Sequence, residues 1–496
     1  MSGVWGETGQ NGPIRRIRGG QVARPAPGAW RAPREASRRT TSAHDTGFAD
    51  AAPAPRGLDG DGAFALALFL PLLFIAQLTT AGAALVAGLA PLYLYYRRKG
   101  LGAVLAPRSF LFAIPAFALL SVFWSEAPAE SLRFALELAV TVVVGFLLSS
   151  ARRQESVVRG LCLAFLIYMI AARIGGGTVG IGVGAGGEAF SGLTSSKNLL
   201  GDIASTGLIV SMAAVAMALR SRAWIWLAVG VCGIAIDLYT VTATRSAGAL
   251  LGLGMGVGAM VALTPLIYVG KAMRGWLTGA VALCMVMGGL FYRTLSMAMI
   301  DFGANLFDKD PTLTGRTYLW YRAADLIREK PMLGRGYYSF WRQGNIDAEG
   351  LWRYFGIDDR GGFTFHNTLV DILVTLGWLG AAVIFAVVLV GVIALVARFV
   401  RRPSLSLVFW ISLFLYQLVR TPIETIGIAP FYFSTALAFA ALGAAFRRAR
   451  PAMARRTPSP GRPAVVALRS WTVAGAETGS VAGRIRRPVS LPPQGR

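Results

Sequence analysis

Long apolar stretches alternate with short polar breaks along most of this chain. The stretches run for about 17–25 residues, the length of a helix that crosses a hydrocarbon core of roughly 30 Å. This pattern predicts an all-α polytopic membrane protein with about 12 transmembrane helices. The predicted spans are 62–78, 81–96, 109–124, 131–150, 156–173, 198–219, 223–242, 246–269, 275–297, 367–397, 404–420 and 428–446. The span at 367–397 is long enough to tilt or to extend beyond the bilayer.

The two ends of the chain differ in composition from the apolar middle. Residues 1–60 and 447–496 are rich in Arg, Pro, Gly and Ala, which predicts disordered basic segments. Helices one to nine then occupy residues 61–297, and helices ten to twelve occupy residues 367–446.

The loop between the ninth and tenth spans is the largest polar segment of the apolar middle. Residues 298–366 hold nine basic and nine acidic residues, and the length of the loop predicts a folded, partly helical cap. Within it, Thr314–Lys330 has the pattern of an amphipathic helix that Pro331 ends. Its apolar face would consist of Leu319, Ala323, Leu326 and Ile327.

Basic residues gather in alternate loops. The positive-inside rule places these loops, and both termini, in the cytoplasm. The loop 298–366 then faces outward. The basic loops contain Arg97, Arg98 and Lys99; Arg152, Arg153 and Arg159; Arg220 and Arg222; Lys271 and Arg274; Arg398, Arg401 and Arg402; and Arg447, Arg448 and Arg450.

Composition narrows the possible function classes. The chain is 54% hydrophobic and 15% charged with a net charge of +24, whereas soluble domains carry about a quarter charged residues. Because the positive charge lies in the tails and short loops, it favours membrane topology over nucleic-acid binding, and the tails could contact anionic lipid headgroups. Cys162, Cys232 and Cys284 lie in apolar spans as packing residues, and the sequence contains no metal-ligand cluster.

One histidine is a candidate general base. His366 is the only histidine outside the N-terminal segment, and it lies on the outer side where the tenth span begins. Thr364 is placed to cap that helix, and the positive end of the helix dipole disfavours an imidazolium. A neutral imidazole there could act as a base near pH 7, while a purely structural role is the alternative.

Three cations on the outer side are candidates for binding an anion. Arg245 lies in a polar break between two spans, against the positive-inside bias, and either binds an anion or snorkels. Arg316 lies in the first turn of the amphipathic helix, where free N–H groups and a guanidinium would form a phosphate site; a solvated arginine is the alternative. Lys197 either joins that site or anchors the sixth span. In the last outer loop, a mutual ion pair is the simplest explanation of Arg420 and Glu424.

Short segments in a fixed order between residues 121 and 380 add a family resemblance. They are Trp124-Ser125-x-x-Pro128, Lys197-Asn198-x-x-Gly201, Thr244-Arg245-Ser246, Gly315-Arg316 with Trp320 and then Pro331-x-x-Gly334-x-Gly336, and His366-Asn367-x9-Gly377-x-x-Gly380. Each alone is weak. Their order and their common outer placement resemble the O-antigen ligases and the related Wzy-type polysaccharide polymerases, including ExoQ-like exopolysaccharide polymerases.

This resemblance implies a reaction. The donor would be a glycan on undecaprenyl pyrophosphate, transferred to an acceptor sugar in the periplasm without a metal or other cofactor, at the bacterial inner membrane. Other partners would be the acceptor glycan or lipid, membrane lipids and further polysaccharide assembly or export proteins, with no nucleic acid. In these roles, His366 would be catalytic, Arg245, Arg316 and Lys197 would bind pyrophosphate, and Asn198, Gly315 and Asn367 would support them.

Three function classes remain open at this point. A polymerase that extends exopolysaccharide repeats and a ligase that caps lipid A–core differ only in their acceptor, and the segments resemble the polymerases slightly more. A transporter or flippase would need charges near the midplane and internal repeats. Asp237 and Glu137 lie deepest, neither has an obvious cationic partner, and no repeat is visible. A structural assembly protein would not depend on His366.

Overall fold

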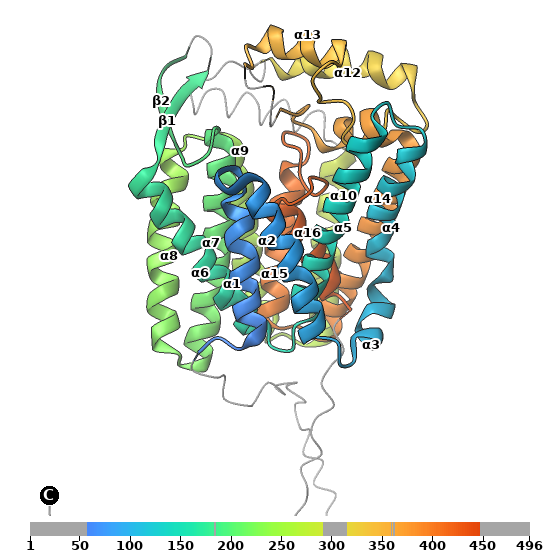
Figure 1. The fold of residues 1–496 in the computed structure, drawn as a ribbon. Coiled ribbons are helices and arrows are strands. Elements are labelled where there is room, and N and C mark those ends of the chain that lie inside the picture. The colour runs from blue at the N-terminus through green and yellow to red at the C-terminus, as the bar shows by residue number, and fades with distance from the viewer. Residues whose placement is uncertain (1–56, 183–184, 291–314, 359, 361–362, 447–496) are drawn as a thin grey trace, which may run out of the picture. The chain divides into compact units, whose positions relative to one another are not determined.

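Helices make up nearly all the regular structure of the protein in the computed structural model (Figure 1). The structure describes residues 57–182, 185–290, 315–358, 360 and 363–446. The predicted disordered tails, apart from residues 57–60, and the part of the cap loop at 298–314 lie outside the described residues.

The helices fall into a membrane set and a cap set. The membrane set is α1 (Gly60–Leu73), α2 (Ile75–Tyr96), α3 (Leu101–Leu105), η1 (Ala106–Phe112), α4 (Ala113–Leu120), η2 (Ser121–Phe123), α5 (Pro128–Ser150), α6 (Gln154–Gly175), α7 (Lys197–Ser221), α8 (Trp224–Ala243), α9 (Ala247–Leu266), α10 (Lys271–Leu290), α14 (Thr368–Arg401), α15 (Leu405–Arg420) and α16 (Phe433–Ala444). The cap set is α12 (Arg316–Glu329) and α13 (Ile346–Phe355).

Each predicted span overlaps helical structure, and the chain is a multi-pass membrane protein. Within the described ranges, eight helical segments are long and apolar enough to cross a membrane. α1, α15 and α16 are apolar but shorter. The ninth predicted span overlaps α10 and continues beyond residue 290, outside the described residues. The count of 12 therefore stays a prediction.

Polar segments between the spans are more ordered than their sequence indicates. The amphipathic helix is confirmed as α12, in which Leu319, Ala323 and Leu326 are 1%, 0% and 3% exposed. α13 was not predicted individually. A two-stranded antiparallel hairpin, β1 (Gly177–Gly182) with β2 (Ala185–Gly192), joins α6 to α7. The prediction of an all-α fold therefore needs this one exception, which was missed because the Gly-rich segment has no alternation of apolar and polar residues.

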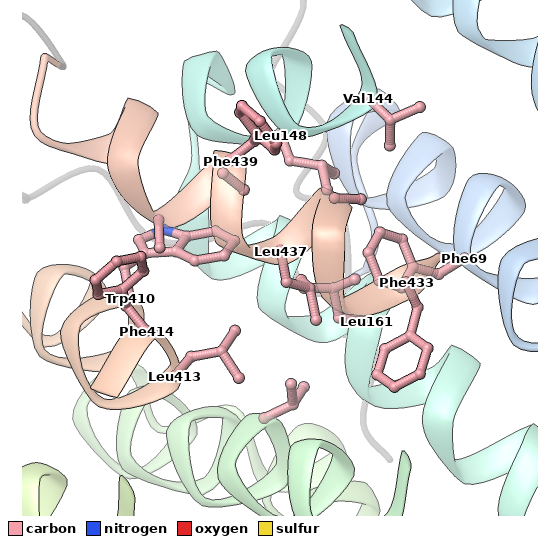
Figure 2. Packing of buried hydrophobic residues seen from close by; sticks show 14 of the residues in the cluster. Phe69, Val144, Leu148, Leu161, Trp410, Leu413, Phe414, Phe433, Leu437 and Phe439 are labelled. Carbon is pink, nitrogen blue, oxygen red and sulfur yellow. The ribbon is translucent and has the colours of Figure 1, made fainter. Parts of the chain in front are cut away.

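The short helix α16 lies within the apolar core. Figure 2 shows its Phe433 and Leu437 among apolar side chains from α1, α5, α6 and α15. Nearly every residue of α16 is buried. Its backbone approaches α5 so closely that a Cβ on Gly145 would lie 2.6 Å from the carbonyl oxygen of Ala436. Small residues permit this close packing where lipid offers no hydrophobic driving force between helices.

The long predicted span at 367–397 is not one continuous helix. α14 is interrupted at Gly377, whose φ of 64° and ψ of −169° are not helical. In an unbroken helix, the N–H groups of Trp378 and Leu379 would bond to the carbonyl groups of Val374 and Thr375. The interruption removes these partners, and an unsatisfied backbone group in an apolar environment costs several kcal/mol.

The cap segment Pro331–Gly336 supplies the missing partners. It accepts two hydrogen bonds from N–H groups of α14 that follow Gly377, and it donates two to carbonyl groups of α14 that precede Gly377. The four bonds run from Trp378 N to Pro331 O (2.9 Å), Leu379 N to Met332 O (3.1 Å), Arg335 N to Val374 O (3.0 Å) and Gly336 N to Thr375 O (2.8 Å). The cap is therefore attached to the bundle through the backbone at this interruption.

Glycines let these segments approach. A Cβ on Gly377 would overlap the carbonyl group of Met332, and one on Gly334 would lie 2.5 Å from the carbonyl carbon of Thr375. The segment before α5 completes the contact, because Nε1 of Trp124 donates to the carbonyl oxygen of Leu333 at 2.8 Å. Three segments that carry the family resemblance, those containing Trp124, Gly334 and Gly377, thus meet at the interruption of α14, although they are far apart in the chain.

Substitution Gly377→Ala should destabilise the protein. The new methyl group would occupy the space of the Met332 carbonyl, and alanine is disfavoured at a φ of 64°. Backbone strain of this kind costs about 1–3 kcal/mol, so the apparent Tm of the purified protein should fall by roughly 2 °C or more.

The matched control is Gly258→Ala in α9, where a Cβ meets nothing within 4 Å. This variant should unfold close to the wild-type temperature. Equal melting of Gly377→Ala and wild type would contradict the tight contact at the interruption.

Candidate active site

The residue after His366 caps α14. Oδ1 of Asn367 accepts hydrogen bonds from the N–H groups of Leu369 at 3.0 Å and Val370 at 3.2 Å. The prediction that Thr364 caps this helix is wrong, because Asn367 occupies the cap position directly before the first helical residue. The hydroxyl of Thr364 instead accepts from the N–H of His366 at 3.1 Å.

The N-terminal end of α14 also binds residues 421–426, which follow α15. The amide nitrogen of the cap side chain donates to the carbonyl oxygen of Pro422 at 3.1 Å. Thr368 donates its hydroxyl to the carbonyl oxygen of Glu424 at 2.9 Å, and the carboxylate of Asp371 accepts from the hydroxyl of Thr425. These bonds hold the backbone on both sides of Glu424.

Glu424 contacts both of the leading candidate residues. Its Oε2 lies 3.2 Å from Nδ1 of His366, and its Oε1 accepts from Nη2 of Arg316 at 3.0 Å. The side chains of His366, Glu424 and Arg316 are 29%, 18% and 14% exposed. The predicted base and one predicted anion-binding arginine are thus joined through one largely buried carboxylate, for which the sequence analysis predicted no functional role.

The charge of Glu424 determines which nitrogen of His366 carries a proton. Burial alone would raise the pKa of Glu424, but the hydrogen bond from His366 and the positive charge of Arg316 outweigh it and lower the pKa to about 2. The carboxylate is therefore charged at neutral pH. A neutral imidazole places its proton on Nδ1, facing this acceptor, and leaves Nε2 as an acceptor for another proton.

The backbone and the surrounding rings fix the position of His366. Its φ is 49° and that of Arg245 is 47°, values that are uncommon for residues other than glycine and that concentrate at functional sites. The ring of Phe363 packs edge-on against the imidazole with 5.7 Å between centroids. Trp320 of α12 donates to the carbonyl oxygen of Phe365 at 2.9 Å, so α12 positions the imidazole as well as Arg316.

The start of α12 follows a glycine that the sequence singled out. Gly315 has a φ of 84°, and a Cβ on it would lie 2.7 Å from the ring of Phe355 in α13. Nη1 of Arg316 donates to the carbonyl oxygen of Ile423 at 2.6 Å. The guanidinium is therefore oriented by two acceptors of the loop after α15.

Arg420 has a different partner from the one expected. It forms a buried ion pair with Asp202 of α7, and Tyr416 and Tyr432 both donate to the same carboxylate, at 2.7 Å and 3.0 Å. The prediction of a mutual Arg420–Glu424 ion pair is therefore wrong. Asp202 was missed because a buried acid in an apolar span gives no indication of its partner.

The remaining predicted residues lie at the adjoining ends of α7 and α9. Lys197 begins α7, and Oδ1 of Asn198 accepts from the hydroxyl of Ser246 at 2.9 Å, next to Arg245. The start of α9 packs against the loop that carries Glu424, because a Cβ on Gly248 would lie 2.8 Å from Cδ1 of Ile423. Arg245 thus lies in the turn before α9, the helix that approaches the loop that carries Glu424, and Lys197 lies at the start of the neighbouring α7.

Comparison with known proteins agrees with the resemblance seen in the sequence. Residues 207–385 match the sequence model of a family described as O-antigen ligase. The exopolysaccharide production protein ExoQ of Rhizobium meliloti (strain 1021) is 30% identical over 364 residues, which cover 71% of this chain and 80% of that protein. The chain belongs to the O-antigen ligase family. The matched range contains Arg245, Arg316 and His366 and excludes Glu424.

Membership of the O-antigen ligase family places the chain among membrane enzymes that polymerise or ligate glycans. Of the two acids that the sequence analysis placed deepest, Glu137 has a cationic partner against the expectation, whereas Asp237 forms no ion pair within the described part of the chain. Glu137 pairs with Arg133 at 3.1 Å, and Asp237 accepts a hydrogen bond from Ser211 at 3.2 Å. Among the side chains described, no three His, Cys, Asp or Glu residues form a group that could hold a metal ion.

The contribution of Glu424 to stability should depend on pH. Because its pKa falls from 4.5 to about 2 on folding, the charged carboxylate stabilises the fold fully above pH 4.5 and loses this effect as the pH falls toward 2. The wild type should therefore melt at a higher temperature than Glu424→Gln at pH 7, and the difference should shrink as the pH falls from about 5 to about 3.

Thermal unfolding in detergent over this pH range measures the difference. The control is Glu349→Gln in α13, which removes an acid whose ion pair with Arg360 is more exposed and should contribute at most about 1 kcal/mol. A wild-type advantage over Glu424→Gln that is constant down to pH 3 would contradict the assigned charge state.

Proposed function

We propose that this protein transfers a glycan from undecaprenyl pyrophosphate to a hydroxyl of an acceptor sugar, as an exopolysaccharide repeat-unit polymerase. The observation that carries the proposal is the connection of His366 to Arg316 through Glu424, at 3.2 Å and 3.0 Å. A general base and an anion-binding group side by side are what glycosyl transfer from a pyrophosphate requires.

In the proposed reaction, the acceptor hydroxyl attacks the anomeric carbon of the donor glycan. A carbon–oxygen bond forms to the acceptor while the bond to the pyrophosphate oxygen breaks. Nε2 of His366 takes the proton of the hydroxyl, and undecaprenyl pyrophosphate leaves with the electron pair of the broken bond. Pyrophosphate is a good leaving group, so the protein mainly has to position the reactants and stabilise the charge on the pyrophosphate.

Arg316 and Arg245 are the proposed ligands of the pyrophosphate, with Lys197 beside them. Arg316 begins α12, where the helix dipole also favours an anion. Guanidinium groups bind phosphate oxygens in a bidentate manner, so the proposed reaction does not need a divalent metal. It should proceed in the presence of EDTA.

The alternation of basic loops supports a site on the periplasmic side of the bacterial inner membrane, with both termini in the cytoplasm. The relative named for exopolysaccharide production favours a polymerase. A ligase that transfers the glycan to lipid A–core is the second candidate, because the matching family is described as O-antigen ligase. Both reactions use the same donor chemistry and differ in the acceptor.

Substitution His366→Ala should nearly abolish glycan formation. General-base catalysis contributes about 10²–10⁴ in rate, and lipid-linked repeats should accumulate because donor binding by the arginines remains. The measurement is glycan length on a gel, together with the pool of lipid-linked repeats, in a strain that lacks the chromosomal gene. His44→Ala, at the other histidine, is the control. Normal polymer from the His366 variant would remove this residue from catalysis.

Substitutions Arg316→Ala and Arg245→Ala should each greatly reduce glycan formation at a normal protein level. Lysine at either position should rescue only partly, because a point charge cannot replace the bidentate contact. The control is Arg322→Ala on α12, where the side chain is 40% exposed and its removal should leave glycan formation near normal. Near-normal product from both test variants would exclude the proposed pyrophosphate contacts.

A further inference from the structure

Glu424 divides its two oxygens between the two functional groups. Oε2 faces Nδ1 of His366, and Oε1 faces Nη2 of Arg316. No other carboxylate forms a hydrogen bond or an ion pair with either side chain in the part of the chain that the structure describes. One side chain therefore contributes to the orientation of both the imidazole and the guanidinium.

The position of Glu424 does not depend on these two partners. Its carbonyl oxygen accepts from the hydroxyl of Thr368 at 2.9 Å, and its N–H donates to the carbonyl oxygen of Arg420 at 2.9 Å. The next residue, Thr425, is bonded to Asp371. Because α14 and α15 hold the backbone on both sides, the carboxylate is a fixed reference to which His366 and Arg316 are aligned.

We propose that Glu424 is a positioning residue that couples donor binding to the strength of the base. This inference rests on the proposed function of His366 and Arg316. Without the donor, Glu424 shares its negative charge between the guanidinium and the imidazole. A pyrophosphate that binds Arg316 competes for the guanidinium, and the carboxylate then acts mainly on His366.

The consequence appears when the acceptor proton moves. As Nε2 of His366 takes that proton, the ring becomes positively charged, and the carboxylate at Nδ1 stabilises this charge while fixing the tautomer. Asp371 on α14 also interacts with the charge of His366, while Arg316 on α12 and Arg420, which is paired with Asp202, act on Glu424. Of the two acids near the imidazole, Glu424 is the one that also contacts the proposed donor-binding arginine.

Glu424→Gln tests this coupling because it keeps the shape of the side chain and removes the charge. With the purified full-length protein and lipid-linked repeats extracted from a deletion strain, kcat should fall at least about 10-fold, while KM for the lipid-linked repeat should not rise. Binding of undecaprenyl pyrophosphate alone should be equal or tighter, since the anion that competes for Arg316 is gone. The acidic limb of the pH–rate profile should move to lower pH, because a protonated imidazole loses its stabilising neighbour.

A second variant keeps the test decisive if the first folds poorly. Glu424→Asp keeps the charge but is shorter by one methylene group and cannot contact both partners, so kcat should fall while the acidic limb keeps its position. Glu349→Gln is the matched control and should match wild type in kcat, KM and pH profile.

The outcomes separate this inference from the proposed function. Wild-type kcat in Glu424→Gln, with His366→Ala inactive, overturns the positioning role and leaves the proposed function standing. A lower kcat with weaker binding of undecaprenyl pyrophosphate and an unmoved acidic limb also overturns it, since a structural defect alone would give that result. Full activity of His366→Ala overturns the proposed function itself.

Discussion

The exchange of backbone hydrogen bonds at Gly377 is the constraint on which the arrangement of the site depends. A helix interrupted in an apolar environment needs new partners for its N–H and carbonyl groups, and the Pro331–Gly336 segment provides four. This segment follows α12 directly, and the interruption lies eleven residues beyond His366 in the sequence. The same contact therefore fixes both Arg316, at the start of α12, and His366, at the start of α14, to one frame.

A second layer of polar contacts brings Glu424 into that frame. The first residues of α14 bond to the backbone of residues 421–426, so a loop that is distant in sequence becomes part of the same structure. Charged groups at this position are stabilised by one another, since His366 and Arg316 lower the pKa of Glu424 to about 2 despite its burial. The result is a charged carboxylate in contact with both an oriented imidazole and a guanidinium.

The sequence predicted the elements well because membrane helices leave a strong local signal. Apolar length located every helix of the membrane set except the short α3, and the amphipathic pattern located α12. The interruption of α14 was missed because glycine is common in membrane helices, and only the approach of Met332 explains why Gly377 has a positive φ. His366 and Arg316 could be selected from their rarity and placement. Glu424 could not be selected in this way, because Arg420, its nearest charged neighbour in sequence, was a simple partner for it. Only the fold shows that Arg420 pairs with Asp202 instead.

The most direct test of the central claim is a structure of the protein with undecaprenyl pyrophosphate bound. The account predicts the pyrophosphate between Arg316 and Arg245, within hydrogen-bond distance of both guanidinium groups. Its terminal phosphate, which carries the glycan in the donor, should lie on the side of Nε2 of His366. It also predicts that Nδ1 of His366 still faces Glu424. A pyrophosphate bound elsewhere, with His366 more than about 10 Å away and therefore beyond the reach of direct proton transfer, would contradict the account.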